Sequence, residues 1–209
     1  MAEIPQRTLF GDGKNPTREF VRRYAFFGAI VVMAAVKLDD VDSLWQLWTD
    51  PDVRRFLWDD RTVTREEAAV MVADWLSVRR QGLGLWTLHA GAPVASGAAP
   101  DRTLQGCAGL MPVTTAAAFD GRIGGLVEPL VALAPRAWRR GYAQAARAAL
   151  QRHAMDALGL ITLAGVTDVP NDASHRMLAR AGLVPLGEVP GPRYRLRTYL
   201  WHAFDAAVM

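Results

Sequence analysis

An apolar segment that turns into an alanine-rich helix and returns as a second apolar segment limits the folds open to this chain. Residues 124–133 have the composition of a buried strand, and residues 141–158 that of an Ala-rich helix closed by Gly159. Residues 160–166 are rich in the β-branched and aliphatic residues that strands favour. A strand, a helix and a second strand in this order form a crossover connection, which indicates the α/β class.

The remaining pattern predicts a central mixed β-sheet (α/β, with α+β character) of about six to seven strands, flanked by helices. Besides the two strands above, the predicted strands are 27–37, 85–89, 105–113, 183–189 and 195–204, with a hairpin loop over 91–103. Asp39 and Asp40 open a short helix that Asp50-Pro51-Asp52 breaks.

Two further helices carry end signals. Thr64-Arg65-Glu66-Glu67 has the spacing of a capping box, and Gly82 ends the helix that follows it. Asn171 is the predicted N-cap of a helix that Gly182 closes.

Length and composition predict one globular domain. The chain has 209 residues; residues 1–15 lack hydrophobic periodicity and are expected to form a loose tail, which leaves 16–209 as a single domain. The one cysteine, Cys107, excludes an intrachain disulfide, favours a cytoplasmic location and reads as an inert core thiol.

The charge pattern argues against two classes of partner. The net charge is +3 and the arginines are scattered, whereas nucleic-acid binders usually show a continuous basic stripe. The apolar run 24–36 is shorter than the about 20 residues that span a bilayer. We therefore expect neither a nucleic-acid partner nor a membrane segment.

The segment between the crossover strand and its helix has the features of a phosphate site. The first turn of a helix offers unpaired N–H groups and the positive end of the helix dipole. Gly141 and Ala143 allow close backbone approach there, and Arg139 and Arg140 add positive charge. A turn that merely connects strand to helix explains the same residues, so the feature by itself leaves both interpretations open.

Two motifs in the right order resemble the GNAT superfamily of N-acetyltransferases, most closely its RimJ/RimL branch. Residues 138–143, Trp-Arg-Arg-Gly-Tyr-Ala, resemble the pyrophosphate loop, and Asn171-x-x-Ser174 with the following Ala181-Gly182-Leu183 resembles the second acyl-CoA motif. The resemblance covers roughly residues 38–201. Arg139 departs from the pattern by replacing a frequent glycine, and the first strand lacks the usual Arg-Leu-x-Leu-Arg alternation.

The resemblance implies that acetyl-CoA, as co-substrate, lies where the fourth and fifth strands splay apart, and that a primary amine attacks its thioester directly. The acceptor would be a protein N-terminus or a small amine; the alternative is a non-catalytic module that binds acyl-CoA. A homodimer is possible. The implied cofactor-binding residues are Leu133, Trp138, Arg139, Arg140, Gly141, Tyr142, Ala143, Gln144, Asn171 and Ser174.

The catalytic candidates follow from the same resemblance. Glu128 is the first candidate for the base that accepts the amine proton, against the alternative of an ion-paired strand carboxylate; Glu188 and Asp168 are weaker candidates. Ser174 is the candidate proton donor to the leaving thiolate, against the alternative of a simple helix-terminal hydroxyl. The four histidines show no ligand spacing, so no metal is expected.

Overall fold

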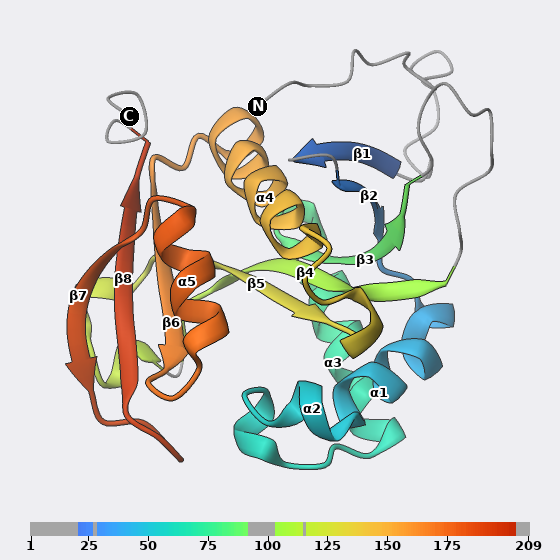
Figure 1. The fold of residues 1–209 in the computed structure, drawn as a ribbon, viewed down its shortest axis with the longest axis horizontal. Coiled ribbons are helices and arrows are strands. Elements are labelled where there is room, and N and C mark those ends of the chain that lie inside the picture. Colours follow the sequence, from blue (N-terminus) through green and yellow to red (C-terminus); the bar gives the residue numbers. More distant parts are fainter. Residues whose placement is uncertain (1–20, 27–28, 92–102, 115, 204–209) are drawn as a thin grey trace.

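The computed structural model describes residues 21–26, 29–91, 103–114 and 116–203. The predicted tail over 1–15 and most of the predicted hairpin loop over 91–103 lie outside these residues. Figure 1 shows the described part as two sheets with helices packed against them.

The strands form one five-stranded and one three-stranded sheet, and every strand pair within them is antiparallel. The first sheet has the order β1-β2-β3-β4-β5 and the second the order β6-β8-β7. The strands are β1 Val21–Phe26, β2 Ala29–Ala35, β3 Gly84–Ala90, β4 Leu104–Pro112, β5 Val127–Leu133, β6 Thr162–Asp168, β7 Val184–Val189 and β8 Leu196–His202.

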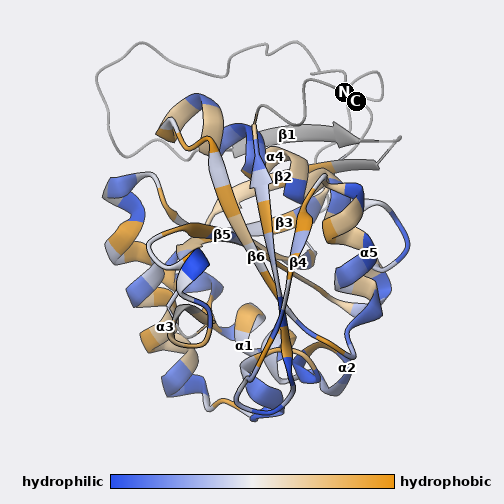
Figure 2. Ribbon diagram, turned by 90° about the vertical axis from the view of Figure 1, so that its left-hand side faces the viewer, coloured by the Kyte–Doolittle hydropathy of each residue, from blue (hydrophilic) through white to orange (hydrophobic). Residues whose placement is uncertain are grey.

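Helices cover both faces of the five-stranded sheet. One face packs against α4, through a core that includes Ala146, Leu150 and Leu88, and the other packs against α1 and α3, around Leu44, Val72 and Leu85. The α-helices are α1 Val41–Thr49, α2 Pro51–Arg54, α3 Arg65–Ser77, α4 Tyr142–Leu158 and α5 Asp172–Arg180. Figure 2 shows both hydrophobic and hydrophilic colour along α3, whose buried side chains are Ala68, Val72 and Trp75.

The predicted helix ends agree with the structure. The Thr64 hydroxyl accepts a hydrogen bond from the Glu67 amide at 3.2 Å, and the Glu67 carboxylate accepts one from the Thr64 amide at 2.7 Å. The helical segment then ends at Gly82, whose φ of 76° favours glycine. Asp50 ends α1, and it also caps α2 by accepting from the Asp52 amide at 2.9 Å.

The expected first strand over 27–37 contains β2, but the prediction missed β1, which precedes it. The apolar run is divided into β1 and β2, an antiparallel hairpin in which Phe26 pairs with Ala29. The run contains no charge that would mark where the strand reverses, so its composition alone could not show the division. This extra strand raises the number of strands among the described residues to eight.

The expected splay lies between β5 and β6. These strands are joined by α4 and lie against each other, yet β5 hydrogen bonds only to β4 and β6 only to β8 within the described sheets. Figure 1 shows them running in the same general sense with diverging carboxyl ends. The edges of β5 and β6 that face each other therefore have backbone N–H and C=O groups that form no hydrogen bonds between the described strands.

Candidate active site

The edge of β5 that faces β6 can be read from its hydrogen bonds. The Leu126 carbonyl accepts from the Val113 amide at 2.8 Å, and the Ala134 amide donates to the Gln105 carbonyl at 2.9 Å. Because backbone groups alternate along an antiparallel strand, the even-numbered residues face β4. The backbone groups of Pro129, Val131 and Leu133 therefore face the gap toward β6.

Two long side chains bind carbonyls on this edge. The Trp138 indole Nε1 donates to the Leu133 carbonyl at 2.8 Å, and Arg147 Nη1 donates to the Pro129 carbonyl at 3.1 Å. Since proline has no N–H, the alternation leaves the Leu133 amide and both backbone groups of Val131 directed into the gap. Near the carboxyl end of β5, these groups are available to an extended ligand.

The predicted phosphate loop connects this edge to the start of α4. Trp138, Arg139 and Arg140 are exposed, and Gly141 is the N-cap of α4 with a φ of 80°. The amides of Tyr142, Ala143 and Gln144 have no partner within the helix, because they lie in its first turn. Glycine at the N-cap position has no side chain that could accept from them. The loop thus presents three N–H groups beside two guanidinium groups.

The second predicted motif follows the carboxyl end of β6. The Asn171 side-chain oxygen accepts from the Ser174 amide at 3.1 Å, so the expected N-cap is confirmed. Ser174 is half-buried in the first turn of α5. Among the described residues, no hydrogen bond joins Asn171 or Ser174 to the loop over 138–144, so the two motifs lie at separate strand ends flanking the gap.

Glu128 lies on β5 with an altered proton affinity. Burial raises its pKa to about 7, against a smaller opposing effect of the Arg147 charge. It occupies an even-numbered position, so its side chain lies on the same side of the sheet as Leu130 and Ala132, which pack toward α1 and α3. A carboxyl group with a pKa near 7 can both lose and gain a proton at neutral pH.

The two weaker candidates differ in their surroundings. Hydrogen bonds from Arg197, at 2.5 Å, and from Arg195, at 3.3 Å, lower the pKa of Glu188. Such an ion-paired carboxylate is a poor base. Burial, followed by the charge of Asp59, raises the pKa of Asp168.

Sequence reasoning missed two polar groups near the motifs. Arg147 is 1% exposed, although nothing in an Ala-rich helix marks one arginine as buried. His175 lies 2.6 Å from the Tyr199 hydroxyl and 2.8 Å from the Val169 carbonyl. Since the carbonyl can only accept, Nε2 of His175 carries the proton and Nδ1 accepts from the Tyr199 hydroxyl in the neutral ring.

Two tryptophans on the α1 and α2 side of the sheet pack against each other. Trp48 is buried and meets the Trp58 ring edge-on, with ring centroids 5.7 Å apart. The backbone of Trp58, Asp59 and Asp60 adopts positive φ values of 54°, 54° and 63°. Non-glycine residues rarely adopt such angles, so this turn stores strain.

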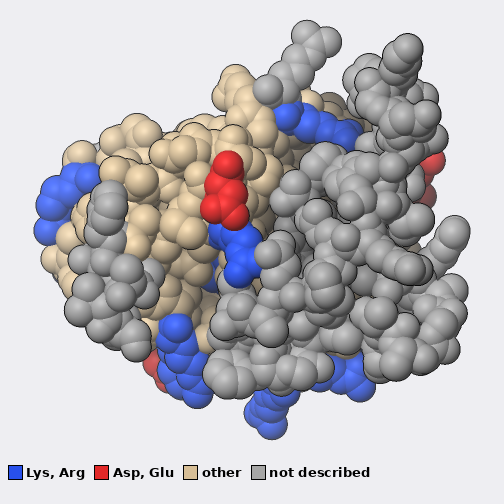
Figure 3. Space-filling model, turned by 90° about the horizontal axis from the view of Figure 1, so that it is seen from above, with Lys and Arg blue, Asp and Glu red and all other residues tan. Residues whose placement is uncertain are grey.

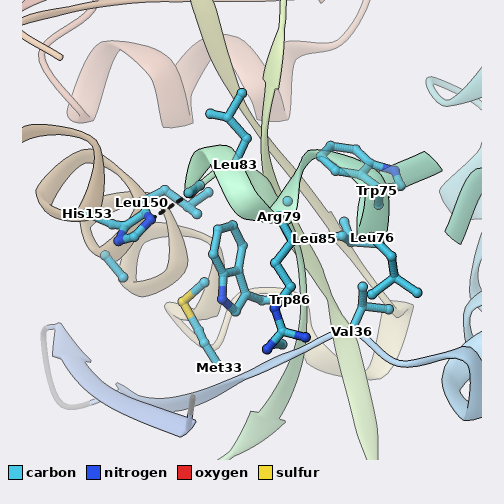
Figure 4. Close-up of a pocket in the computed structure, with 14 residues that line it drawn as sticks. Met33, Val36, Trp75, Leu76, Arg79, Leu83, Leu85, Trp86, Leu150 and His153 are labelled. Atoms are coloured by element: carbon cyan, nitrogen blue, oxygen red, sulfur yellow. Dashed lines mark hydrogen bonds between the residues drawn. The ribbon is translucent and has the colours of Figure 1, made fainter. Parts of the chain in front are cut away.

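A cavity of about 230 Å³ lies elsewhere, between η3 (Val78–Gln81), β2, β3 and α4. Figure 4 shows Met33, Trp86 and Arg79 around it, with His153 hydrogen bonded to the Gly82 carbonyl at 2.9 Å. None of the predicted site residues lines this cavity. It is therefore separate from the gap between β5 and β6.

Burial raises the pKa of the Cys107 thiol to about 11, so it is neutral at pH 7. No cluster of metal-binding side chains occurs within the described ranges. No helix among them is long and apolar enough to cross a membrane. Figure 3 shows Lys and Arg in separate groups on the described part of one face.

The family model of the GNAT acetyltransferase domain matches residues 31–184, which include the gap and the loop. The chain belongs to this family. This GNAT protein is an acyl-CoA-dependent N-acetyltransferase, which moves an acetyl group from acetyl-CoA to an amine. No curated protein sequence matches it significantly.

Solved structures show the same fold. A GNAT-family acetyltransferase from Bordetella pertussis is 19% identical with a TM-score of 0.66, over 86% of this chain and 99% of that one. RimL, a ribosomal α-N-protein acetyltransferase in complex with coenzyme A, is 12% identical with a TM-score of 0.65, over 87% and 98%. The microcin self-immunity acetyltransferase MccE, in complex with acetyl-CoA and AMP, is 11% identical with a TM-score of 0.62, over 82% and 92%.

Proposed function

We propose that acetyl-CoA binds in the gap between β5 and β6, with its diphosphate at the first turn of α4. The amides of Tyr142, Ala143 and Gln144 would donate to the phosphate oxygens, and Arg139 and Arg140 would supply positive charge. The observation that carries this proposal is that the unpaired edge of β5 leads directly into that turn. Asn171 and Ser174 would line the opposite side, after β6.

The pantetheine arm would extend along the edge of β5. Its amide groups match the free backbone groups of Val131, and the thioester carbonyl would accept from the Leu133 amide. A donor placed there stabilises the negative charge that develops on the carbonyl oxygen during attack. Trp138 holds the Leu133 carbonyl by its hydrogen bond, which fixes the direction of this peptide edge.

Glu128 is the proposed general base. The acceptor amine is largely protonated at neutral pH, because alkylamines have a pKa near that of lysine, about 10.4. Removal of one proton, directly or through water, exposes the nitrogen lone pair that attacks the thioester carbon. The C–S bond then breaks, and Ser174 is the proposed proton donor to the leaving thiolate.

The acceptor is proposed to be a protein N-terminus or a small amine. The similarity to RimL in fold favours the first, and the position of Glu128 on the α1 and α3 side supports an approach of the amine from that side of the sheet. A panel of peptides and small amines, assayed by release of free thiol from acetyl-CoA, tests this choice. Thiol release confined to small amines would contradict a protein acceptor.

Replacement of Gly141 tests the phosphate site. Gly141→Glu should reduce acetyl-CoA affinity at least about 100-fold, because a carboxylate repels phosphate and a side chain blocks the turn. Isothermal titration calorimetry measures the affinity. The matched control is Gly159→Glu at the other end of α4, where φ is 65° and a side chain meets open space.

The control should lose stability from backbone strain and retain its affinity for acetyl-CoA. Equal affinity in folded Gly141→Glu and Gly159→Glu would refute the placement of the diphosphate.

Replacement of Glu128 tests the base. In the wild type, kcat/KM should rise with pH through about 7, the pKa of this carboxyl, because only the ionised form accepts a proton. Glu128→Gln should lose this dependence and about 100-fold in kcat, with positioning sustaining the residual rate. An unchanged pH profile in Glu128→Gln would assign the base elsewhere, with Asp168 next to be tested.

A further inference from the structure

Arg147 is a buried cation with unused donors. It is 1% exposed, and its Nη1 donates to the Pro129 carbonyl at 3.1 Å. Its Nε and Nη2 have no hydrogen-bond partner among the described residues. A buried guanidinium costs considerable free energy unless an opposite charge offsets the loss of hydration.

The surroundings of Arg147 on α4 do not require a charge. The neighbouring buried positions of the helix are Ala145, Ala146, Ala149 and Leu150, all in the apolar core. An aliphatic side chain would pack there without any loss of hydration. The presence of arginine therefore suggests a negatively charged group with which the guanidinium interacts.

Glu128 is that partner, acting from the other side of β5: its side chain lies on the α1 and α3 side of the sheet, whereas α4 covers the opposite face. Glu128 precedes Pro129, the residue that holds the guanidinium, and it supplies the acidic charge that acts on Arg147. The other groups packed near this strand act elsewhere: Cys107 on β4 is neutral, and Asp168 on β6 interacts with Asp59 and Arg193. On α4 itself, Arg147 is the group whose charge reaches Glu128.

The pair is spaced more widely than a salt bridge. No contact of 4 Å or less joins the two side chains, so Arg147 favours the ionised carboxylate at a distance without binding it directly. Such an arrangement leaves the carboxylate oxygens free for a substrate proton. The low polarity of the surroundings strengthens the effect, because little water screens the two charges.

We propose that Arg147 is a positioning residue whose fixed charge, held at the β5 edge by the Pro129 carbonyl, favours the ionised form of Glu128 for proton abstraction. This inference rests on the proposed role of Glu128 as the base. Arg147 contacts neither the amine nor the thioester in this scheme. Its removal should leave Glu128 in place but protonated at neutral pH.

The test compares Arg147→Met with the wild type. Methionine has a similar length and no charge, so the pKa of Glu128 should rise by about one unit when the opposing cation is lost. Titration of ¹³C-labelled glutamate carboxyl groups by NMR measures this directly, with the resonance assigned by its absence in Glu128→Gln. The acidic limb of kcat/KM should move by the same amount, and activity at pH 7 should fall about fivefold.

Two further variants separate charge from structure. Arg147→Lys keeps the charge and should retain a Glu128 titration close to that of the wild type; it also serves if Arg147→Met fails to fold. Arg180→Met removes an equal charge from the exposed surface of α5 and should change nothing. A purely structural role would lower stability without moving the titration.

The possible results distinguish this inference from the proposed function. A raised Glu128 pKa with no effect of Glu128→Gln on turnover would retain the electrostatic pairing and reject the base. An unchanged Glu128 titration in folded Arg147→Met, or a rise in Arg147→Lys as large as in Arg147→Met, would overturn the inference. Weaker acetyl-CoA binding with an unchanged titration would also overturn it, and would assign the free donors to the co-substrate.

Discussion

At the scale of single residues, the phosphate loop contains a side chain where the family often has glycine. Arg139 adopts a φ of 60°, which disfavours residues with a Cβ. The strain is retained at the point where positive charge is useful for binding a diphosphate. The loop therefore combines a conformational cost with a proposed binding gain in one residue.

Arg139→Gly should separate the two effects. Relief of the left-handed conformation should raise the free energy of unfolding by about 0.5–1 kcal/mol, net of the greater freedom of glycine in the unfolded chain. Loss of the guanidinium should weaken acetyl-CoA binding. Urea unfolding and calorimetry measure the two quantities.

Arg140→Gly is the matched control, because its φ is not positive. It should lose affinity and also lose stability. Equal stability changes in the two variants would show that the strain at Arg139 carries no energetic consequence.

At the scale of elements, the segment before β5 is tied to the second sheet by one carboxylate. Asp120, which is 5% exposed, accepts from the Thr198 hydroxyl on β8 at 2.6 Å and from Arg122 Nε at 2.8 Å. The Arg122 hydrogen bond is the largest cause that lowers the pKa of Asp120, and burial opposes it. This contact links the entry of β5 to the sheet that contains β6, and so bears on the gap between them.

Asp120→Asn should lower the free energy of unfolding at pH 7 by about 1.5–3 kcal/mol, since hydrogen bonds to a charged group are lost. The depressed pKa means that the stabilisation is present above the unfolded value, about 3.9, and is lost as pH falls below it. Urea unfolding at pH 7 and pH 3 should show a smaller difference between variant and wild type at pH 3. A constant difference across this range would contradict a role for the ionised form.

At the scale of the whole molecule, two sheets meet at strands that share no ladder. A ligand seated between β5 and β6 would contact both sheets and hold them together. Because the gap exists only in the native state, a ligand that binds there stabilises the native state against unfolding.

Acetyl-CoA at 100 times its Kd should therefore stabilise the protein by about 2.7 kcal/mol. For a chain of this size that corresponds to a rise in Tm of about 5–10 °C, which differential scanning calorimetry can follow. Pantetheine, which lacks the diphosphate, should have little effect at the same concentration. Equal shifts with both compounds would contradict a binding mode led by the loop before α4.

Local signals in the sequence predicted the elements, and distant contacts decided what the sequence left open. The Thr64 capping box and the Asn171 cap depend on residues three apart, so they could be recognised directly. The reversal within the first apolar run joins neighbouring residues, such as Phe26 and Ala29, but no charged residue marks it. The burial of Arg147 depends on a partner far along the chain. No pattern near Arg147 distinguishes it from the other arginines, because Pro129 lies 18 positions away.

The same limit applies to the site. The small-residue turn and the spacing of the two motifs predicted the location of the acetyl-CoA site, and the residues at these positions flank the gap. The altered proton affinity of Glu128 depends on burial beneath distant elements, and sequence alone could name it only as a candidate. Its role stays a prediction until Glu128→Gln is measured.

The buried Cys107 has a practical consequence for work on this enzyme. Because it is the one thiol in the chain and lies sealed in the core as the neutral form, aromatic disulfide reagents will react slowly with the folded protein. The absorbance that develops during turnover then reports the coenzyme A released, with little contribution from the thiol of the enzyme itself. In the absence of co-substrate, the rate at which the same reagent modifies this single thiol measures how often the core opens spontaneously.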